Sequence, residues 1–224
     1  MNTLIICPTY RLEPETVNSI FRLRPVGGMD IVFTRDNPHD TPEENVAHNY
    51  CKAQRMALDG DYDALLTVES DNIIPADTLE RLYAVDADVA MGLYLFRHGN
   101  PLLNAFVSNK PDDLGNSLSH FPQRLAEAWK QGIIEVTGAG FGCTLIHRHV
   151  LEAIPFRHES GAYSDWHFAK DCQRAGYITK MDFGVRCGHK RPEDGLIFWP
   201  TPDDKFLASQ GLLLDGWHMA EARQ

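Results

Sequence analysis

The chain has 224 residues, and 31 Asp and Glu against 21 Lys and Arg give it a formal net charge of −10. This balance argues against general nucleic-acid binding, which needs an excess of cations to displace the counterions of the phosphates. Hydrophobic residues make up 43% of the chain and charged residues 23%, a globular composition that excludes a disordered or fibrous chain.

Apolar runs alternate with helix-start signals over the first hundred residues. We expect strands at residues 3–6, 30–34, 64–68 and 88–96. Proline in the first turn predicts helices that begin near residues 14, 42 and 75. This alternation predicts an α/β fold with a doubly wound, mostly parallel sheet and right-handed crossovers.

The pattern beyond residue 100 is less regular. We expect further strands at residues 102–107, 133–136, 143–146 and 177–182. A helix is expected at 164–175. No linker rich in Ser, Gly or Pro divides the chain, so the sequence predicts one domain over residues 1–224.

Targeting signals and cysteine spacing bear on the location of the chain. No apolar run reaches the roughly 18–20 residues that cross a bilayer, so no transmembrane helix is expected. The first residues lack the basic region of a signal peptide, and we expect a cytoplasmic location. The five cysteines show no Cys-x-x-Cys spacing, which favours reduced thiols over a disulfide framework or a zinc site.

The first chemical motif is Glu69-Ser70-Asp71, directly after the apolar run 64–68. Ligands of open α/β sheets bind beyond the carboxyl ends of the strands. Two carboxylates one residue apart at that edge can hold a hard divalent cation, which in turn neutralises a diphosphate. The alternative is that these acids only cap the following helix.

Three other segments carry chemistry. Residues 187–191, Cys-Gly-His-Lys-Arg, offer an imidazole for a metal and cations for phosphates. Residues 138–143 form a glycine-rich turn, typical of a backbone that approaches a ligand, but they match neither a dinucleotide fingerprint nor a Walker loop. Ser164-Asp165-Trp166 begins a predicted helix. Either Ser164 or Asp165 is simply its N-cap, or Asp165 is a carboxylate of the site.

The order of these motifs resembles that of small glycosyltransferases with the GT-A fold, similar to family 2 and to its compact bacterial and phage versions. The resemblance runs from Leu4 to about Lys190. It rests on Cys-Pro-Thr-Tyr at residues 7–10, the acidic motif at 69–71 in place of Asp-x-Asp, and the segments 138–141, 164–168 and 188–189.

The resemblance implies a GT-A fold, a Rossmann-like α/β fold of nucleotide-diphospho-sugar transferases, with a mostly parallel central sheet flanked by helices. It implies a nucleotide-binding half at residues 1–100, an acceptor-side half at 101–192 and a C-terminal tail or lid at 193–224. In that tail, Phe198, Trp199 and Trp217 either close over the acceptor or pack against the core or another subunit.

The resemblance also implies roles for individual residues. The donor would be bound by Pro8, Thr9, Tyr10, Arg35, Asn49, Lys52, Glu69, Ser70 and Lys190. A Mn²⁺ or Mg²⁺ cofactor would be held by Asp71, His189 and Glu69. Asp165 would be the catalytic base. The acceptor side would consist of Gly138, Ala139, Gly140, Phe141 and Trp166.

Two positions depart from the family pattern. Glu69 replaces the first aspartate of Asp-x-Asp, which keeps the charge on a longer arm. Ser164 replaces the acid that usually precedes Asp165, so a pair of carboxylates becomes one. If Asp165 only caps the helix, base catalysis is absent or the reaction retains configuration; otherwise an inverting, hexosyltransferase-like enzyme is expected.

The sequence thus predicts a metal-dependent glycosyltransferase that moves a sugar from a nucleoside diphosphate sugar, UDP- or GDP-linked, to an acceptor hydroxyl. One alternative is a non-catalytic nucleotide-sugar-binding module of the same fold. Another is a sugar-phosphate nucleotidyltransferase, which would be expected to carry a glycine-rich loop with Arg and Lys after the first strand, whereas residues 8–12 contain no glycine. The sugar, the base and the acceptor stay open.

Overall fold

The computed structural model describes residues 1–9, 11–96, 102–110, 113–159 and 163–202. The expectations for Tyr10 and for the tail beyond residue 202, which includes Trp217, therefore lie outside the described residues. None of the helices in the described ranges has the length and apolar character needed to span a membrane.

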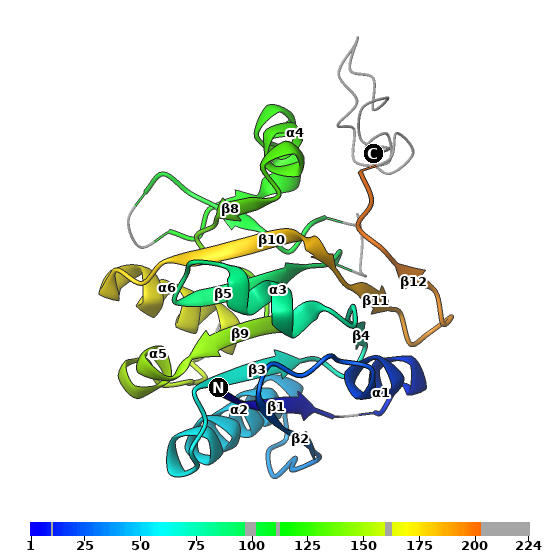
Figure 1. Ribbon diagram of the computed structural model, residues 1–224, viewed down its shortest axis with the longest axis vertical. Coiled ribbons are helices and arrows are strands. Elements are labelled where there is room, and N and C mark those ends of the chain that lie inside the picture. Colours follow the sequence, from blue (N-terminus) through cyan, green and yellow to red (C-terminus); the bar gives the residue numbers. More distant parts are fainter. Residues whose placement is uncertain (10, 97–101, 111–112, 160–162, 203–224) are drawn as a thin grey trace.

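A seven-stranded sheet forms the centre of the molecule (Figure 1). Its strands are β1 (Asn2–Pro8), β2 (Gly28–Thr34), β3 (Ala64–Val68), β5 (Val89–Leu93), β8 (Ile133–Glu135), β9 (Cys143–His147) and β10 (Thr179–Arg186). Their spatial order is β2-β1-β3-β9-β5-β10-β8. β1, β2, β3, β5 and β10 run in one direction, and only β9 and β8 oppose them. This confirms the predicted mostly parallel α/β sheet.

Helices cover both faces of the sheet. They are α1 (Pro14–Phe21), α2 (Pro42–Asp59), α3 (Thr78–Ala84), α4 (Pro122–Gln131), α5 (Arg148–Ala153) and α6 (Ser164–Ala175), with a 3₁₀ turn at Leu118–His120. Leu4 and Ile6 of β1 belong to the core that includes α2, α5 and α6, whereas Ile5 and Cys7 belong to the core beneath α1 and α3. The alternation of side chains along a buried strand thus supplies two apolar layers.

Two small sheets flank the central one. One contains β4 (Asn72–Ile73), β11 (Gly188–Lys190) and β12 (Ile197–Phe198), and the other pairs β6 (Phe106–Val107) with β7 (Asn116–Ser117). In the first, His189 of β11 is the antiparallel partner of Asn72. This pairing brings the last sequence motif beside the acidic motif, although more than a hundred residues separate them in the chain.

Local patterns predicted most elements well but missed some. The helix expected at 164–175 is confirmed at both ends. Gly176 takes a left-handed conformation just after it, which is a common way for a helix to end. The expected strand 102–107 is wrong in length: Leu103 makes an isolated bridge to Leu95, and only β6 remains. α4 was not expected, although Pro122 in its first turn and Gly132 after its end are ordinary helix signals.

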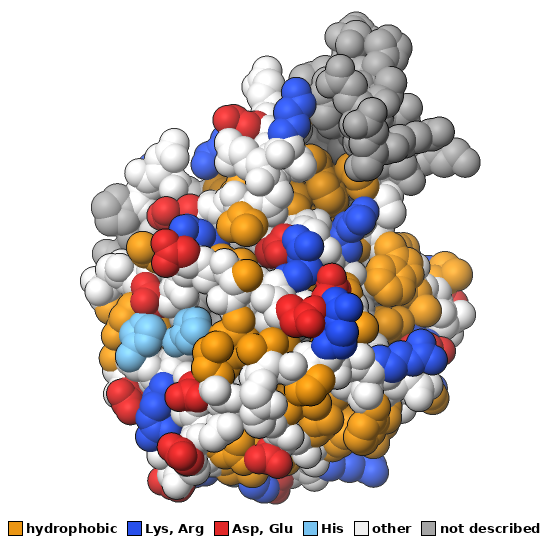
Figure 2. All heavy atoms as spheres, viewed as in Figure 1, with side chains coloured by type: hydrophobic (Ala, Val, Ile, Leu, Met, Phe, Trp, Pro, Cys, Tyr) orange, Lys and Arg blue, Asp and Glu red, His pale blue; other side chains and the backbone are white. Residues whose placement is uncertain are grey.

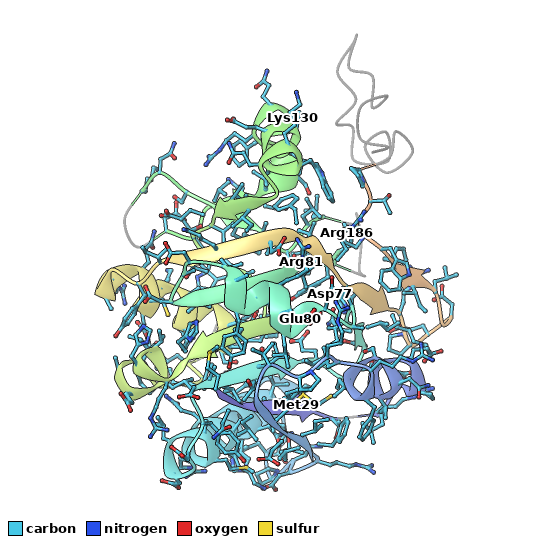
Figure 3. All side chains as sticks on the ribbon, viewed as in Figure 1. Met29, Asp77, Glu80, Arg81, Lys130 and Arg186 are labelled. Carbon is cyan, nitrogen blue, oxygen red and sulfur yellow. The ribbon has the colours of Figure 1, made fainter. Side chains whose placement is uncertain are left out.

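Charged residues on the α3 face hold this helix to the sheet. Arg81 donates hydrogen bonds to both carboxylate oxygens of the buried Asp182 on β10, at 3.0 and 2.8 Å. Figure 3 shows Asp77, Glu80 and Arg81 close together at α3, with Arg186 nearby. Acidic and basic side chains are interspersed over this face in Figure 2. It therefore shows no single-signed patch of the kind that binds a polyanion.

Arg148 joins α5 to the end of α2. Its guanidinium donates hydrogen bonds to the backbone carbonyls of Ala57, Leu58, Gly60 and Tyr62 at 2.9–3.2 Å. Carbonyls at the end of a helix lack partners within the helix, so a fixed cation satisfies them. Arg148→Met is expected to lower the free energy of unfolding by about 2–3 kcal/mol, measured by urea denaturation. Arg55→Met, at an exposed position of α2, should change it little; equal losses in both variants would contradict the assignment.

Candidate functional site

A cavity of about 950 Å³ opens where β1, β2 and β3 end. Its walls come from the segments after these strands, the first turns of α2, the end of β5, the start of α6, and β11. The lining residues are Pro8, Thr9, Asn37, His39, Asp40, Pro42, Asn45, Val46, Asn49, Tyr50, Glu69, Ser70, Asp71, Tyr94, Phe96, Tyr163, Asp165 and His189. This is the edge at which open α/β sheets bind ligands.

The acidic motif is held by backbone hydrogen bonds at this edge. The amide of Asn72 donates to the carbonyl of Glu69 at 3.0 Å, which closes a tight turn after β3. The amide of Lys190 donates to the carbonyl of Asp71 at 2.8 Å, so β11 is attached to the same turn. As a result, Asp71 Oδ1 and His189 Nε2 lie 3.4 Å apart, and both side chains are largely buried.

His189 is oriented by a carbonyl behind it. Its Nδ1 lies 2.6 Å from the carbonyl oxygen of Leu95, which can only accept, so Nδ1 carries the hydrogen. In the neutral ring, Nε2 then directs a lone pair toward the Asp71 carboxylate. A carbonyl that fixes the tautomer in this way is the usual support of a metal-binding histidine. Two acceptors in such a position are compatible with a cation bound between them.

The pair offers one carboxylate oxygen, a donor that suits Mg²⁺ and Mn²⁺, and one imidazole nitrogen, which suits a transition metal better than Mg²⁺. Within the described ranges no group of three or more His, Cys, Asp or Glu side chains is arranged around one point. A cation at Asp71 and His189 would therefore complete its coordination with ligand oxygens and water, which is common for Mg²⁺. Glu69, two residues before Asp71 in the chain, also lines the cavity.

Asp165 also lines the cavity, from the first turn of α6. The N-cap residue is Tyr163, so neither Ser164 nor Asp165 is the N-cap, and that alternative is wrong. Burial disfavours the charged carboxylate and raises the pKa of Asp165 from 3.8 to about 6, although the amide of Trp166 donates to Oδ1 at 2.8 Å. A carboxyl with this pKa is well suited to accept a proton near neutral pH.

The glycine-rich segment passes close to Asp165. A Cβ atom on Gly140 would lie 2.1 Å from the Tyr94 hydroxyl oxygen and 3.3 Å from Asp165 Oδ2. Glycine is thus required where the backbone meets these two side chains. Phe141 is buried beneath the cavity, with its ring centroid 4.9 Å from that of Tyr50.

Eight of the site residues predicted from the sequence line the cavity. Those that line the cavity are Pro8, Thr9, Asn49, Glu69, Ser70, Asp71, Asp165 and His189. Thr9 also has a structural task, because its hydroxyl donates to the carbonyl of Thr34 at 2.7 Å and joins the ends of β1 and β2. The expected acceptor-side residues are not part of the lining: these are Gly138, Ala139, Gly140, Phe141 and the partly exposed Trp166.

Three expected donor-binding cations are not brought to the cavity. Arg35 is exposed away from the lining. Lys52 Nζ lies 3.3 Å from Asp36. Lys190 Nζ lies 2.8 Å from Glu13 and 2.7 Å from Glu15. Lys190 follows His189 on a strand, and successive side chains of a strand point to opposite faces, so it is directed away from the site.

Sequence reasoning missed several lining residues, above all Tyr50 and Tyr94. Tyr94 follows Leu93, the last residue of β5, so its place after a parallel strand was a usable signal. Tyr50 packs in the core on α2 and also lines the cavity. His39 is exposed and also lines the cavity.

Known structures define the fold class of the chain. The crystal structure of A197 from STIV superposes with a TM-score of 0.58 at 18% identity, over 91% of this chain and 96% of that one. S. aureus TarS superposes with a TM-score of 0.52 at 15% identity, over 82% of this chain. The match covers 35% of TarS, so the chain spans about a third of that protein.

The chain has the GT-A fold of nucleotide-diphospho-sugar transferases, as the sequence predicted. TarS itself has been solved in complex with UDP and with UDP-GlcNAc. No family model and no curated protein sequence matches the chain.

Proposed function

We propose that this chain is a metal-dependent glycosyltransferase that moves a sugar from a nucleoside diphosphate sugar to an acceptor hydroxyl. One observation carries the proposal: the Asp71 and His189 pair, 3.4 Å apart, shares a single cavity with Asp165, whose pKa is about 6. Asp71 and His189 suit a cation that binds a diphosphate, and Asp165 suits proton removal from a hydroxyl. UDP-GlcNAc, a ligand of TarS, represents the proposed ligand class.

Asp71 and His189 would hold the Mn²⁺ or Mg²⁺ ion. When bound, such an ion neutralises the charge of the departing diphosphate. The chain itself would position the nucleotide through the segments after β1 and β2. Asn49 supports this arrangement: its Nδ2 donates to the carbonyls of Asp36 and Asn45, while its buried Oδ1 lacks a hydrogen-bond partner among the described residues. Asn49 Oδ1 would accept an N–H or O–H group of the nucleotide.

Asp165 would take the proton of the acceptor hydroxyl. Tyr163, which is exposed and lines the cavity, would contact the acceptor, and Trp166 is exposed three residues further along the chain. The raised pKa of Asp165 places its basicity close to the working pH, where proton transfer is most efficient. A single carboxylate is sufficient for this step, so Ser164 in place of an acid is compatible with an inverting transfer.

Calorimetric titration tests the donor side. Wild-type protein is titrated with UDP and with GDP, first with Mn²⁺ and then after chelation. We expect one nucleotide to bind only with Mn²⁺, and Asp71→Asn to weaken that binding about 100-fold. Asp59→Asn, which removes the same charge at an exposed position of α2, is the matched control. Folded protein that binds neither nucleotide under any condition would contradict the proposal.

Product analysis separates the alternatives. Incubation with the matching nucleotide sugar and Mn²⁺ should release the nucleoside diphosphate, by transfer or by slow hydrolysis. Binding without any release would instead indicate a non-catalytic module. Formation of a nucleoside triphosphate and a sugar 1-phosphate from added pyrophosphate would indicate a nucleotidyltransferase.

A further inference from the structure

The Tyr50 side chain combines a structural ring with a hydroxyl that the fold does not use. Its ring packs against Phe141 and Phe156, at centroid distances of 4.9 and 5.5 Å, and the residue is 1% exposed. Its hydroxyl oxygen is buried and has no hydrogen-bond partner among the described residues. A buried polar group without a partner costs folding free energy, and native proteins retain few of them.

The surroundings of this hydroxyl point to a ligand. Tyr50 lines the cavity that holds Asp71, Asp165 and His189. Burial and the negative charges of Glu69 and Asp165 raise the pKa of Tyr50 well above its usual value, so the hydroxyl keeps its proton and can donate it to a hydrogen bond. Glu69 and Asp165 line the same cavity as Tyr50, so the hydroxyl lies near both the acidic motif and the proposed base.

In the proposed reaction, the region between these two groups is where the transferred sugar lies. The diphosphate would be at Asp71 and His189, and the acceptor hydroxyl would be at Asp165. Sugar hydroxyls and acyl carbonyls supply the acceptor oxygens that a lone donor requires. A phenylalanine would give the same aromatic packing without the cost of an unpaired hydroxyl, so packing alone does not account for the tyrosine.

We propose that the Tyr50 hydroxyl donates a hydrogen bond to the sugar of the bound nucleotide sugar, and thereby makes the site select the nucleotide sugar over the free nucleotide. This inference rests on the proposed glycosyltransferase function, because it requires a nucleotide sugar in the cavity. It assigns to one α2 residue both a place in the core and a contact with substrate.

Tyr50→Phe tests the inference with two opposite effects. Binding is measured calorimetrically with Mn²⁺ for UDP and UDP-GlcNAc, or for GDP and GDP-mannose if the wild type binds GDP. We expect the affinity for the nucleotide sugar to fall about 10-fold, while the affinity for the free nucleotide stays within about twofold. The melting temperature of the free protein should rise by about 2–4 °C, because the variant no longer buries an unpaired hydroxyl.

Tyr83→Phe is the matched control. The Tyr83 hydroxyl is paired with that of Thr3 at 2.7 Å, and Tyr83 does not line the cavity. This variant should lose stability and keep both affinities. An equal loss of both ligands in Tyr50→Phe, or no loss of either, would overturn the inference while the proposed function stands. Wild-type protein that binds no nucleotide would overturn both.

Discussion

Asp165→Asn is expected to lower kcat/KM for sugar transfer about 10³-fold and to leave nucleotide binding intact. Asparagine preserves the shape of the side chain on the first turn of α6 but cannot accept a proton at neutral pH. The Asp71 and His189 pair is on another element and should be unaffected. Rate measurements with a saturating metal, alongside the nucleotide titration, separate the two effects.

The pH profile of the wild type gives an independent measure. Because burial raises the pKa of Asp165 to about 6, the rate should fall as the pH drops through this value and the base becomes protonated. The acidic limb should be missing from the residual activity of Asp165→Asn. A tenfold or smaller loss in this variant, with the limb unchanged, would assign the base to another group.

The pH dependence of stability should be opposite to that of the rate: ionisation of Asp165 raises the rate but lowers the free energy of unfolding. The folded chain binds a proton at Asp165 more tightly than the unfolded chain does, since the pKa rises from 3.8 to about 6. Ionisation of Asp165 therefore costs stability as the pH rises between these two values. The melting temperature of Asp165→Asn minus that of the wild type should therefore be larger at pH 8 than at pH 4.5. Asp59→Asn provides the charge-matched control.

Gly140→Ala is expected to lower activity about 100-fold, because a displacement of about 1 Å among reacting groups has an effect of that size. The added methyl group would overlap the Tyr94 hydroxyl at 2.1 Å and press on Asp165. Tyr94 is buried, so the strain should also lower the free energy of unfolding by about 1–3 kcal/mol. Thermal melts and initial rates measure the two consequences.

Removal of the overlapping atom provides a sharp control. In the Tyr94→Phe background the hydroxyl is absent, and the nearest remaining contacts of an alanine at 140 are 3.3 and 3.4 Å. The double variant should therefore recover most of the stability that Gly140→Ala loses. If Gly140→Ala is equally harmful in both backgrounds, the close approach to Tyr94 is not the reason for glycine at this position.

Local patterns predicted the parts of the fold that depend on neighbouring residues. The buried run of β1 was evident from consecutive apolar residues, and that of β3 from apolar residues interrupted by Thr67 alone. The helix α6 was expected at its observed bounds. The acidic motif was placed at the ligand edge because it follows a parallel strand. The insertion of β9 between β3 and β5 could not be predicted, since these pairings join β9 to segments about 80 and about 55 residues earlier in the chain.

The site residues show the same limit. The face on which Lys190 lies depends on the register between β11 and β4, which a three-residue strand does not specify by itself. Tyr50 was hidden for a different reason, because an aromatic residue on the inner side of a helix matches a core position. Its place in the cavity lining, and a hydroxyl without a hydrogen-bond partner in the described part of the chain, distinguish it from an ordinary core residue.

The position of β9 also determines how the chain can be divided. β9 pairs along both of its edges, Leu65 opposite Ile146 on β3 and Val89 opposite Ile146 on β5. A fragment that ends at residue 96 would keep β3 and β5 but leave the facing edges of these two largely apolar strands without a neighbour. Such edges pair with other molecules. The first hundred residues should therefore aggregate when expressed alone, so the predicted nucleotide-binding half, residues 1–100, is not expected to be a separable module.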